Sequence, residues 1–212
     1  MVSVENLTKK FKEETVIENV NLHMEKGKIY GLVGHNGSGK TVFMKCLCGF
    51  LKPTQGKVTV DGKVIGEDVD FPENVGVMLE TPGFIPYMSG KNNLKNLAMI
   101  QKKIGDKEIH DIMELVGLPP ESRKRVSKYS LGMRQRLGIA QAIMENPKLL
   151  VLDEPFNGLD EQGVGEMREV FLRLKEEGTT ILLASHVKED IQVLCDEIYL
   201  VKNHRIERRE EI

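Results

Sequence analysis

The sequence has few cysteines, almost no net charge and no long apolar run, and each of these shortages excludes a class of protein. Three cysteines occur, Cys46, Cys48 and Cys195, and none has C-x-x-C spacing. This pattern favours reduced packing residues over a disulfide framework or a zinc site. A formal net charge of −2 gives no overall attraction to nucleic acid or to an anionic lipid surface.

Long hydrophobic segments are also missing. No stretch approaches the roughly 20 apolar residues that a bilayer-spanning helix needs, and residues 1–5 do not resemble a signal peptide. We therefore expect a cytoplasmic chain. The 212 residues, 40% of them hydrophobic, are enough for one substantial core, and no repeat or linker divides them. The sequence thus predicts a single domain over residues 1–212.

The most informative motif is a glycine-rich loop with the pattern G-x-x-x-x-G-K-T. The apolar residues 29–33 before it predict a strand, and residues 42–47 after it predict a helix. A loop in this position directs backbone N–H groups and the positive end of the helix dipole at one point, which suits a polyphosphate. Lys40 can reach the outer phosphates and the Thr41 hydroxyl can bind Mg²⁺. The predicted ATP-binding residues of this loop are Gly34, His35, Asn36, Gly37, Ser38, Gly39, Lys40 and Thr41.

Strand-like and helix-like segments alternate along the chain. Near the N-terminus, residues 16–24 alternate loosely between apolar and polar, and residues 58–65 predict a hairpin with an Asp-Gly turn. Residues 92–145 have helical spacing. Continuous apolar strands alternating with helices favour a parallel sheet covered on both faces, so we expect an α/β core with a helical insertion at about residues 88–145. The strands predicted for this sheet are residues 29–33, 75–79, 149–153, 180–184 and 197–201.

Two acidic residues, Asp153 and Glu154, stand at the end of one predicted strand. Solvated acids at a strand end are common, so the pair alone does not indicate a site. With a phosphate loop upstream, however, Mg²⁺ bound to a nucleotide requires a carboxylate at the C-terminal end of a neighbouring strand. Asp153 is therefore predicted to bind Mg²⁺, and Glu154 to polarise the attacking water.

A second predicted anion site begins at Ser130, which can cap the helix that follows it, and Gly132 permits an anion to approach the exposed amides. A single ATP does not need two such sites. The segment resembles the signature loop, usually Leu-Ser-Gly-Gly-Gln, of the ATP-binding subunits of ABC transporters, and the resemblance covers essentially the whole chain. It implies a P-loop NTPase core of ABC type with an N-terminal antiparallel β-subdomain and an inserted α-helical subdomain.

The resemblance assigns roles to three further residues. Asp160 matches the D-loop, His186 matches the switch histidine that contacts the γ-phosphate, and Phe11 matches the aromatic residue that stacks on adenine. A helix cap, an ordinary histidine at a helix N-terminus and a core residue are the respective alternatives. The family arrangement implies a head-to-tail pair, in which Ser130, Gly132 and Asp160 of one copy meet the ATP that the other copy holds.

Two positions depart from the family pattern. Glu80 stands where most ABC subunits have a glutamine that ligates Mg²⁺ and relays the nucleotide state to the membrane partner. A carboxylate there attracts the metal and repels phosphate by similar amounts, about 4 kcal/mol for unit charges about 4 Å apart at an effective dielectric of about 20. We therefore expect Glu80 to act as a metal ligand and catalytic residue with Glu154 and His186. Leu131 replaces a signature glycine, while Gly132 is expected to preserve the phosphate contact.

The glutamate, the signature helix and the segment Glu80-Thr81-Pro82-Gly83-Phe84 are similar to the branch that serves lantibiotic immunity and bacitracin-type peptide export. This similarity implies ATP-driven export of an amphipathic antimicrobial peptide through separately encoded permease subunits, which hold the chain at the inner face of the membrane. No nucleic-acid partner is expected. The alternatives are a soluble ABC-type ATPase acting on the ribosome or nucleic acid, and a transporter subunit for a different substrate.

The permease is expected to dock near the start of the helical insertion. Residues 89–97, together with the apolar residues Phe84, Ile85, Tyr87 and Met88, are predicted to form part of the groove that receives a coupling helix. The alternative is that these four apolar residues cover the core of the domain itself.

Overall fold

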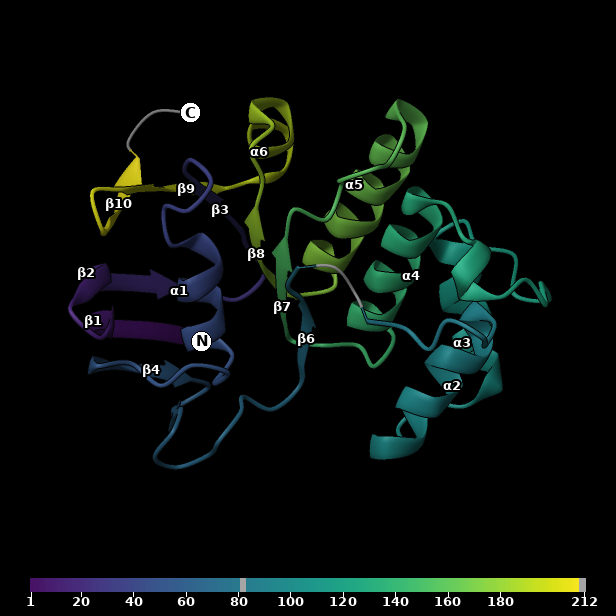
Figure 1. The fold of residues 1–212 in the computed structure, drawn as a ribbon, viewed down its shortest axis with the longest axis horizontal. Coiled ribbons are helices and arrows are strands. Elements are labelled where there is room, and N and C mark those ends of the chain that lie inside the picture. The colour runs from purple at the N-terminus through teal and green to yellow at the C-terminus, as the bar shows by residue number, and fades with distance from the viewer. Residues whose placement is uncertain (81–82, 210–212) are drawn as a thin grey trace.

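The computed structural model describes residues 1–80 and 83–209 and contains two β-sheets and a group of helices (Figure 1). Thr81 and Pro82, which belong to the sequence motif beginning at Glu80, lie outside the described residues. The helices are α1 (Lys40–Leu47), α2 (Gly90–Gln101), α3 (Asp106–Leu115), the short 3-10 helix η1 (Val126–Lys128), α4 (Leu131–Ile143), α5 (Glu161–Glu176) and α6 (Lys188–Leu194). The strands are β1 (Val2–Phe11), β2 (Glu14–Met24), β3 (Ile29–Val33), β4 (Gln55–Val60), β5 (Lys63–Val64), β6 (Val75–Met78), β7 (Leu149–Asp153), β8 (Thr180–Ala184), β9 (Glu197–Lys202) and β10 (Arg205–Arg209).

The strands form one antiparallel sheet and one mixed sheet. The antiparallel sheet has the order β2-β1-β4-β5, and the larger sheet has the order β10-β9-β3-β8-β7-β6. Neighbouring strands from β9 to β6 pair in parallel, whereas β10 pairs antiparallel with β9. The predicted α/β core with an N-terminal antiparallel sheet is therefore confirmed, and the five strands predicted for the larger sheet pair in parallel; the additional edge strand β10, which the sequence analysis did not predict, makes this sheet mixed.

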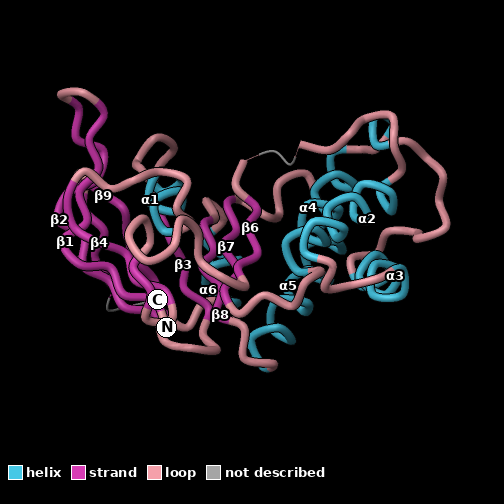
Figure 2. Tube along the Cα trace, turned by 90° about the horizontal axis from the view of Figure 1, so that it is seen from below, coloured by secondary structure: helices cyan, strands magenta, loops and turns pink. Residues whose placement is uncertain are grey.

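The larger sheet lies between two layers, and β7 shows how. Leu150 and Leu152 belong to the core that contains the helices α4, α5 and α6, whereas Leu149 and Val151 belong to the core formed with α1 and the antiparallel sheet. Successive side chains of a strand point to opposite faces, so both faces of β7 are buried, and this burial produces the uninterrupted apolar sequence. In Figures 1 and 2 the antiparallel sheet lies on one side of the larger sheet, and the helices α2 to α5 lie on the other side.

The helices predicted within residues 92–145 are present as α2, α3 and α4. The first of them is capped by Ser89, whose hydroxyl accepts a hydrogen bond from the Asn92 N–H at 3.3 Å. The last, α4, packs directly on the edge strand β6. The two backbones approach so closely that a Cβ added at Gly76 would lie 1.9 Å from the Ala142 carbonyl oxygen, so only glycine fits there. The helical insertion therefore returns to the core through α4. Within the part of the chain that the structure describes, no helix is long and apolar enough to cross a membrane.

The three cysteines are free and buried, as the sequence predicts. Burial raises the pKa of Cys46 to about 11 and the pKa of Cys48 and of Cys195 to about 12. A raised pKa favours the neutral thiol, and the thiolate is the nucleophile, so these side chains are packing residues with little reactivity.

This burial predicts that the cysteines do not react with a thiol reagent while the protein is folded. Raising a thiol pKa from 9.0 to about 11 lowers the thiolate fraction at about pH 8 by about 100-fold, and burial also blocks access. Titration with dithionitrobenzoate should detect almost no thiol in the native protein and three in guanidinium chloride. Rapid labelling of the native protein would contradict the buried placement.

Candidate functional site

The phosphate loop joins the end of β3 to the start of α1, and glycine is needed at both of its ends. Gly39 caps α1 in the left-handed region, with φ 104°, where residues with a Cβ are disfavoured. A Cβ at Gly34 would lie 2.6 Å from the Ser38 hydroxyl and 2.7 Å from the Val201 carbonyl oxygen. The loop is therefore closely folded against the end of β9, and its backbone N–H groups lie at the N-terminus of α1.

The ammonium group of Lys40 is held over this loop. Lys40 Nζ donates to the carbonyl oxygens of Gly34 at 2.7 Å and His35 at 3.2 Å, and the residue is almost fully buried. The positive charge is thus fixed beside the loop amides and the end of the helix dipole. Together these groups form an anion site suited to a phosphate chain.

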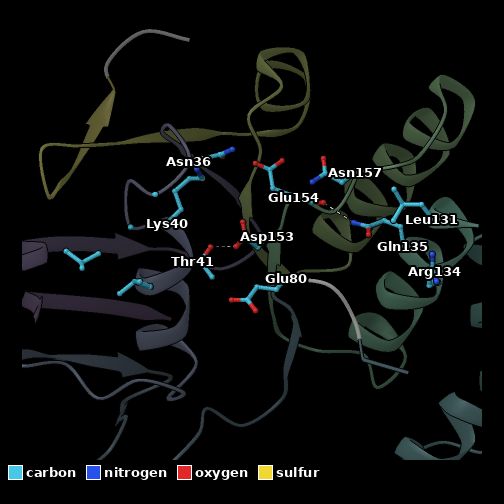
Figure 3. A pocket seen from close by; sticks show the side chains of 14 residues that line it. Asn36, Lys40, Thr41, Glu80, Leu131, Arg134, Gln135, Asp153, Glu154 and Asn157 are labelled. Atoms are coloured by element: carbon cyan, nitrogen blue, oxygen red, sulfur yellow. Dashed lines mark hydrogen bonds between the residues drawn. The ribbon is translucent and has the colours of Figure 1, made fainter. Parts of the chain in front are cut away.

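Thr41 connects this anion site to the acidic end of β7. Its Oγ1 donates a hydrogen bond of 2.5 Å to Asp153 Oδ2, across 112 residues of sequence. Glu80 lines the same cavity as this pair, and Figure 3 shows the three side chains there. All three side chains offer oxygen ligands, which Mg²⁺ prefers, and neighbouring oxygens around an octahedral Mg²⁺ lie about 2.9 Å apart. The donor chemistry of these three side chains therefore fits Mg²⁺.

A cavity of about 750 Å³ contains these groups. Sequence reasoning assigned no individual role to two residues of its far wall, Arg134 and Gln135. Gln135 Nε2 donates to the Glu154 carbonyl oxygen at 2.9 Å, which ties α4 to the turn after β7. The signal available in the sequence was an amide side chain a few residues after Ser130, in the helix that Ser130 caps. The lining residues are Val16, Asn36, Gly37, Gly39, Lys40, Thr41, Val42, Glu80, Leu131, Arg134, Gln135, Asp153, Glu154 and Asn157.

The structure brings Glu154 and His186 together. Glu154 Oε2 lies 2.8 Å from His186 Nδ1 and 3.4 Å from the His186 backbone nitrogen. An ionised carboxylate only accepts hydrogen bonds, so this contact requires the proton on Nδ1. The backbone of Glu154 is left-handed, with φ 51°, a conformation uncommon for residues other than glycine. Such a conformation persists where the surrounding contacts fix it, and here it directs the carboxylate toward the histidine.

A buried network holds the segment that carries His186. Asp190 is 2% exposed, and its Oδ1 accepts from Arg168 Nη2 at 2.6 Å and from Arg168 Nε at 3.2 Å. Its other oxygen accepts from the Ser185 hydroxyl at 3.1 Å. Burial lowers the pKa of Arg168, but the bonds to Asp190 and Glu189 outweigh it and leave the pKa raised. Helix α5 is therefore tied to the residue next to His186.

Ser130, Gly132 and Asp160 line a different hollow, of about 570 Å³. Ser130 Oγ accepts from the Met133 N–H at 3.2 Å and caps α4, and Asp160 Oδ1 accepts from the Gly163 N–H at 2.9 Å and caps α5. Leu131, which is 54% exposed, borders both this hollow and the phosphate cavity. Within one copy the structure therefore does not place Ser130, Gly132 or Asp160 among the residues that line the phosphate cavity.

Phe11 lies at the end of β1, and the residue is 44% exposed, so the alternative of a core residue is wrong. The Lys9 ammonium lies 4.9 Å from the ring centroid. Phe11 is not among the residues that line the phosphate cavity of the described chain. An exposed aromatic face remains available for stacking, and its role stays a prediction.

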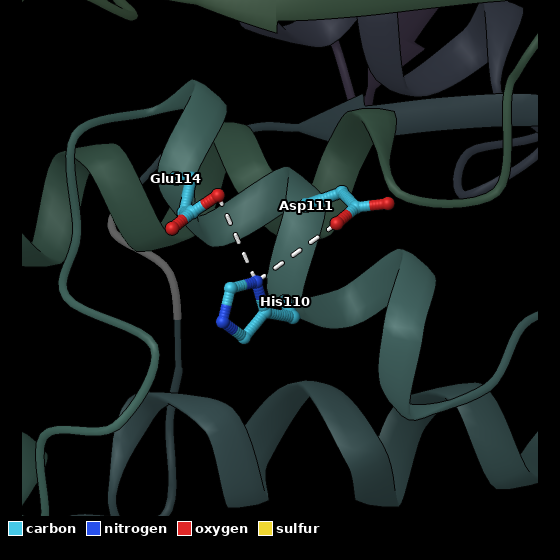
Figure 4. Close-up of side chains that lie close together, drawn as sticks. All are labelled: His110, Asp111 and Glu114. Atoms are coloured by element: carbon cyan, nitrogen blue, oxygen red, sulfur yellow. Dashed lines mark ion pairs between the residues drawn. The ribbon is translucent and has the colours of Figure 1, made fainter.

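Figure 4 shows a separate group of His110, Asp111 and Glu114 on α3. His110 Nδ1 lies 3.9 Å from Asp111 Oδ1 and 3.7 Å from Glu114 Oε2. Both carboxylates are exposed, and the groups come from a single helix surface. Charges arranged this way are common on solvated helices, so we assign no site to them.

The buried ion pair predicts a large loss of stability when one partner is removed. Asp190→Ala leaves the Arg168 guanidinium without its buried partner and should lower the free energy of unfolding by about 3–5 kcal/mol, measured by urea denaturation. The double variant Arg168→Met/Asp190→Leu removes both charges and serves as the control. It should lose much less stability, and an equal loss in both variants would contradict the role of the unpaired charge.

Comparisons with known proteins agree with this geometry. A family model described as ABC transporter matches residues 17–157. The chain is 46% identical to an uncharacterized ABC transporter ATP-binding protein, YybJ, of Bacillus subtilis, over 100% of this chain and 97% of that protein. It is 45% identical to the bacitracin transport ATP-binding protein BcrA of Enterococcus faecalis, over 98% of this chain and 68% of that protein. The lantibiotic transport ATP-binding protein SrtF of Streptococcus pyogenes is 36% identical to this chain, over 97% of this chain and 89% of that protein.

Solved structures share the fold. A dimeric, post-hydrolysis structure of the ATP-binding cassette MJ0796 bound to ADP and phosphate has a TM-score of 0.87 at 24% identity, covering 100% of this chain and 98% of that one. At this identity the likeness establishes the architecture, and the family model and the curated relatives establish the family. The chain belongs to the ATP-binding proteins of ABC transporters and, as a member of that family, is an ATPase.

Proposed function

We propose that residues 1–212 act as one ATP-binding domain that pairs head to tail with a second ATP-binding subunit, a second copy of this chain, and powers export of an antimicrobial peptide. The observation that carries the pairing is the separation of the two hollows. The phosphate loop, Asp153 and Glu154 border one, whereas Ser130 and Asp160 border the other. Each hollow alone offers half of an ATP site, and a second copy supplies the missing half.

The residues of the phosphate cavity have distinct roles in this proposal. Lys40 and the loop amides bind the phosphates, and Thr41, Asp153 and Glu80 hold Mg²⁺. When bound, Mg²⁺ neutralises phosphate charge. Glu154 orients the attacking water and accepts its proton, and His186 holds the Glu154 carboxylate through Nδ1. Phe11 provides the aromatic face for adenine.

The second copy contributes the N-terminus of α4. Ser130 caps this helix and Gly132 follows without a side chain, so α4 presents backbone N–H groups to the phosphate end of the partner's ATP. Leu131 lies over Gly158, where an added Cβ would approach it to 2.4 Å, and it is directed toward the D-loop. The leucine therefore leaves the amides of Gly132 accessible, which supports phosphate contact despite the departure from the usual signature.

The substrate class rests on the relatives. Two proteins named for bacitracin and lantibiotic transport are 45% and 36% identical to this chain over nearly all of its length. Both names refer to antimicrobial peptides. We therefore assign a peptide of this kind as the exported substrate and place the protein at the inner face of the membrane, bound to permease subunits.

A groove beside the edge strand β6 suits such a permease. It has a volume of about 310 Å³ and is bordered by Phe50, Phe71 and Ile100, which are 54%, 55% and 76% exposed. The two phenylalanine rings lie 5.9 Å apart. Of the residues predicted for docking from the sequence, Leu97 borders this groove, whereas Phe84 packs against the core. We propose that an apolar helical segment of the permease occupies it.

Pairing predicts that a hydrolysis-deficient variant accumulates as a dimer. Glu154→Gln removes the proton acceptor and should lower ATP turnover by about 100-fold or more while leaving ATP binding intact. With saturating ATP and Mg²⁺, light scattering should report twice the mass of one chain. The matched control, Glu154→Gln/Lys40→Ala, should remain monomeric because it cannot bind the phosphates. A single variant that stays monomeric with ATP bound would contradict the pairing.

The substrate assignment predicts a change in resistance. Deleting the gene in the source organism should lower the minimum inhibitory concentration of bacitracin or of a lantibiotic, since ATP-driven removal of the peptide is lost. Expression of the wild-type protein should restore the original minimum inhibitory concentration, and expression of the Glu154→Gln variant should not. Unchanged sensitivity to both peptide classes would contradict this substrate while leaving the ATPase assignment intact.

A further inference from the structure

An ion pair joins the helix of the phosphate loop to the position that departs most from the family pattern. Lys45 lies on α1 one turn after Thr41, so both side chains are on the same face of the helix. Lys45 Nζ lies 2.5 Å from Glu80 Oε1. Glu80 borders the phosphate cavity, and Lys45 approaches it from outside that cavity.

The backbone at Glu80 also fixes this contact. β6 ends at Met78, and Glu80 has φ 60°, in the left-handed region. A glutamate is disfavoured there, and such residues persist where the surrounding contacts hold them. The lysine is one such contact. It holds a carboxylate oxygen on the α1 side of the cavity, near the Thr41–Asp153 hydrogen bond.

The pair also balances the charge around the nucleotide. Glu80, Asp153 and Glu154 place three carboxylates at one cavity, where Lys40 and Arg134 are the cationic lining residues within the described chain. A triphosphate adds more negative charge. Lys45 compensates the carboxylate that stands where a neutral glutamine is usual, so the Glu80–Lys45 pair as a whole carries no net charge.

We propose that Lys45 is a positioning residue whose ammonium group competes with Mg²⁺ for the Glu80 carboxylate and so lowers the metal affinity of the ATP-bound protein. The inference rests on the proposed function, in which Glu80 is a metal ligand. Release of the ion pair lets the carboxylate turn toward the metal. The side chains of Lys45 and Glu80 are 31% and 63% exposed, so the pair contributes little to folding stability, and its effect is on the site.

The test measures metal binding directly, with Mn²⁺ as the probe. Electron paramagnetic resonance reports free Mn²⁺ during titration of the full chain with ATP, in the Glu154→Gln background to prevent turnover. Lys45→Met should tighten Mn²⁺ binding by about tenfold when Glu80 is present and by less than about threefold when it is combined with Glu80→Gln. Lys45→Arg keeps the charge and should behave as the parent protein.

A matched control removes an equivalent lysine. Lys63→Met breaks another exposed ion pair, to Glu73 at 2.7 Å, and makes the same change in net charge outside the cavity; it should leave Mn²⁺ affinity unchanged. Thermal unfolding should be nearly the same for all of these variants.

Two results separate the failure of this inference from the failure of the proposed function. If Glu80→Gln changes Mn²⁺ affinity but Lys45→Met does not, or changes it equally with and without Glu80, the positioning role is overturned and the metal site stands. If Glu80→Ala, which removes the ligand oxygen that a glutamine would keep, has no effect on Mn²⁺ binding, Glu80 is not a metal ligand, and both proposals are overturned at this residue.

Discussion

The hydrogen bond from Thr41 to Asp153 is the contact on which the geometry of the site depends. β3 and β7 are not neighbours in the sheet, because β8 lies between them, and the phosphate loop belongs to one and the acidic end to the other. The 2.5 Å contact joins the two side chains across β8, at the place where we propose that a metal ion meets the phosphates. Glu80 and Glu154 are arranged around this point, each in a left-handed backbone conformation that directs its carboxylate.

Burial explains which parts of the fold the sequence predicts. The predicted limits of β7 and β8 agree with the structure because both faces of these strands are buried, which leaves uninterrupted apolar sequence. β1 and β10 were not predicted individually. β1 changes register along its length and is left-handed at Asn6, so it has no regular alternation. β10 is an edge strand in which Ile206 is the buried residue and the others are charged and exposed.

The candidate site was predictable where a local motif carries the chemistry. Residues 34–41 and the Asp153–Glu154 pair stand out because loop geometry and strand ends are written in short stretches of sequence. Gln135 and Lys45 act through contacts with residues 19 and 35 positions away, and only the packed structure brings these groups together. The sequence also indicates an anion site at Ser130. That this site lies in a hollow separate from the phosphate cavity depends on tertiary packing, which the order of the motifs does not specify.

The central claim is that ATP is enclosed between two copies, each providing what the other lacks. An experimental structure of Glu154→Gln with ATP and Mg²⁺ tests it most directly. The account predicts that the γ-phosphate lies between Lys40 of one copy and the α4 N-terminus at Ser130 of its partner, with Glu80 near the metal. A structure in which ATP fills the phosphate cavity of each copy while every Ser130 remains remote from any phosphate would contradict it.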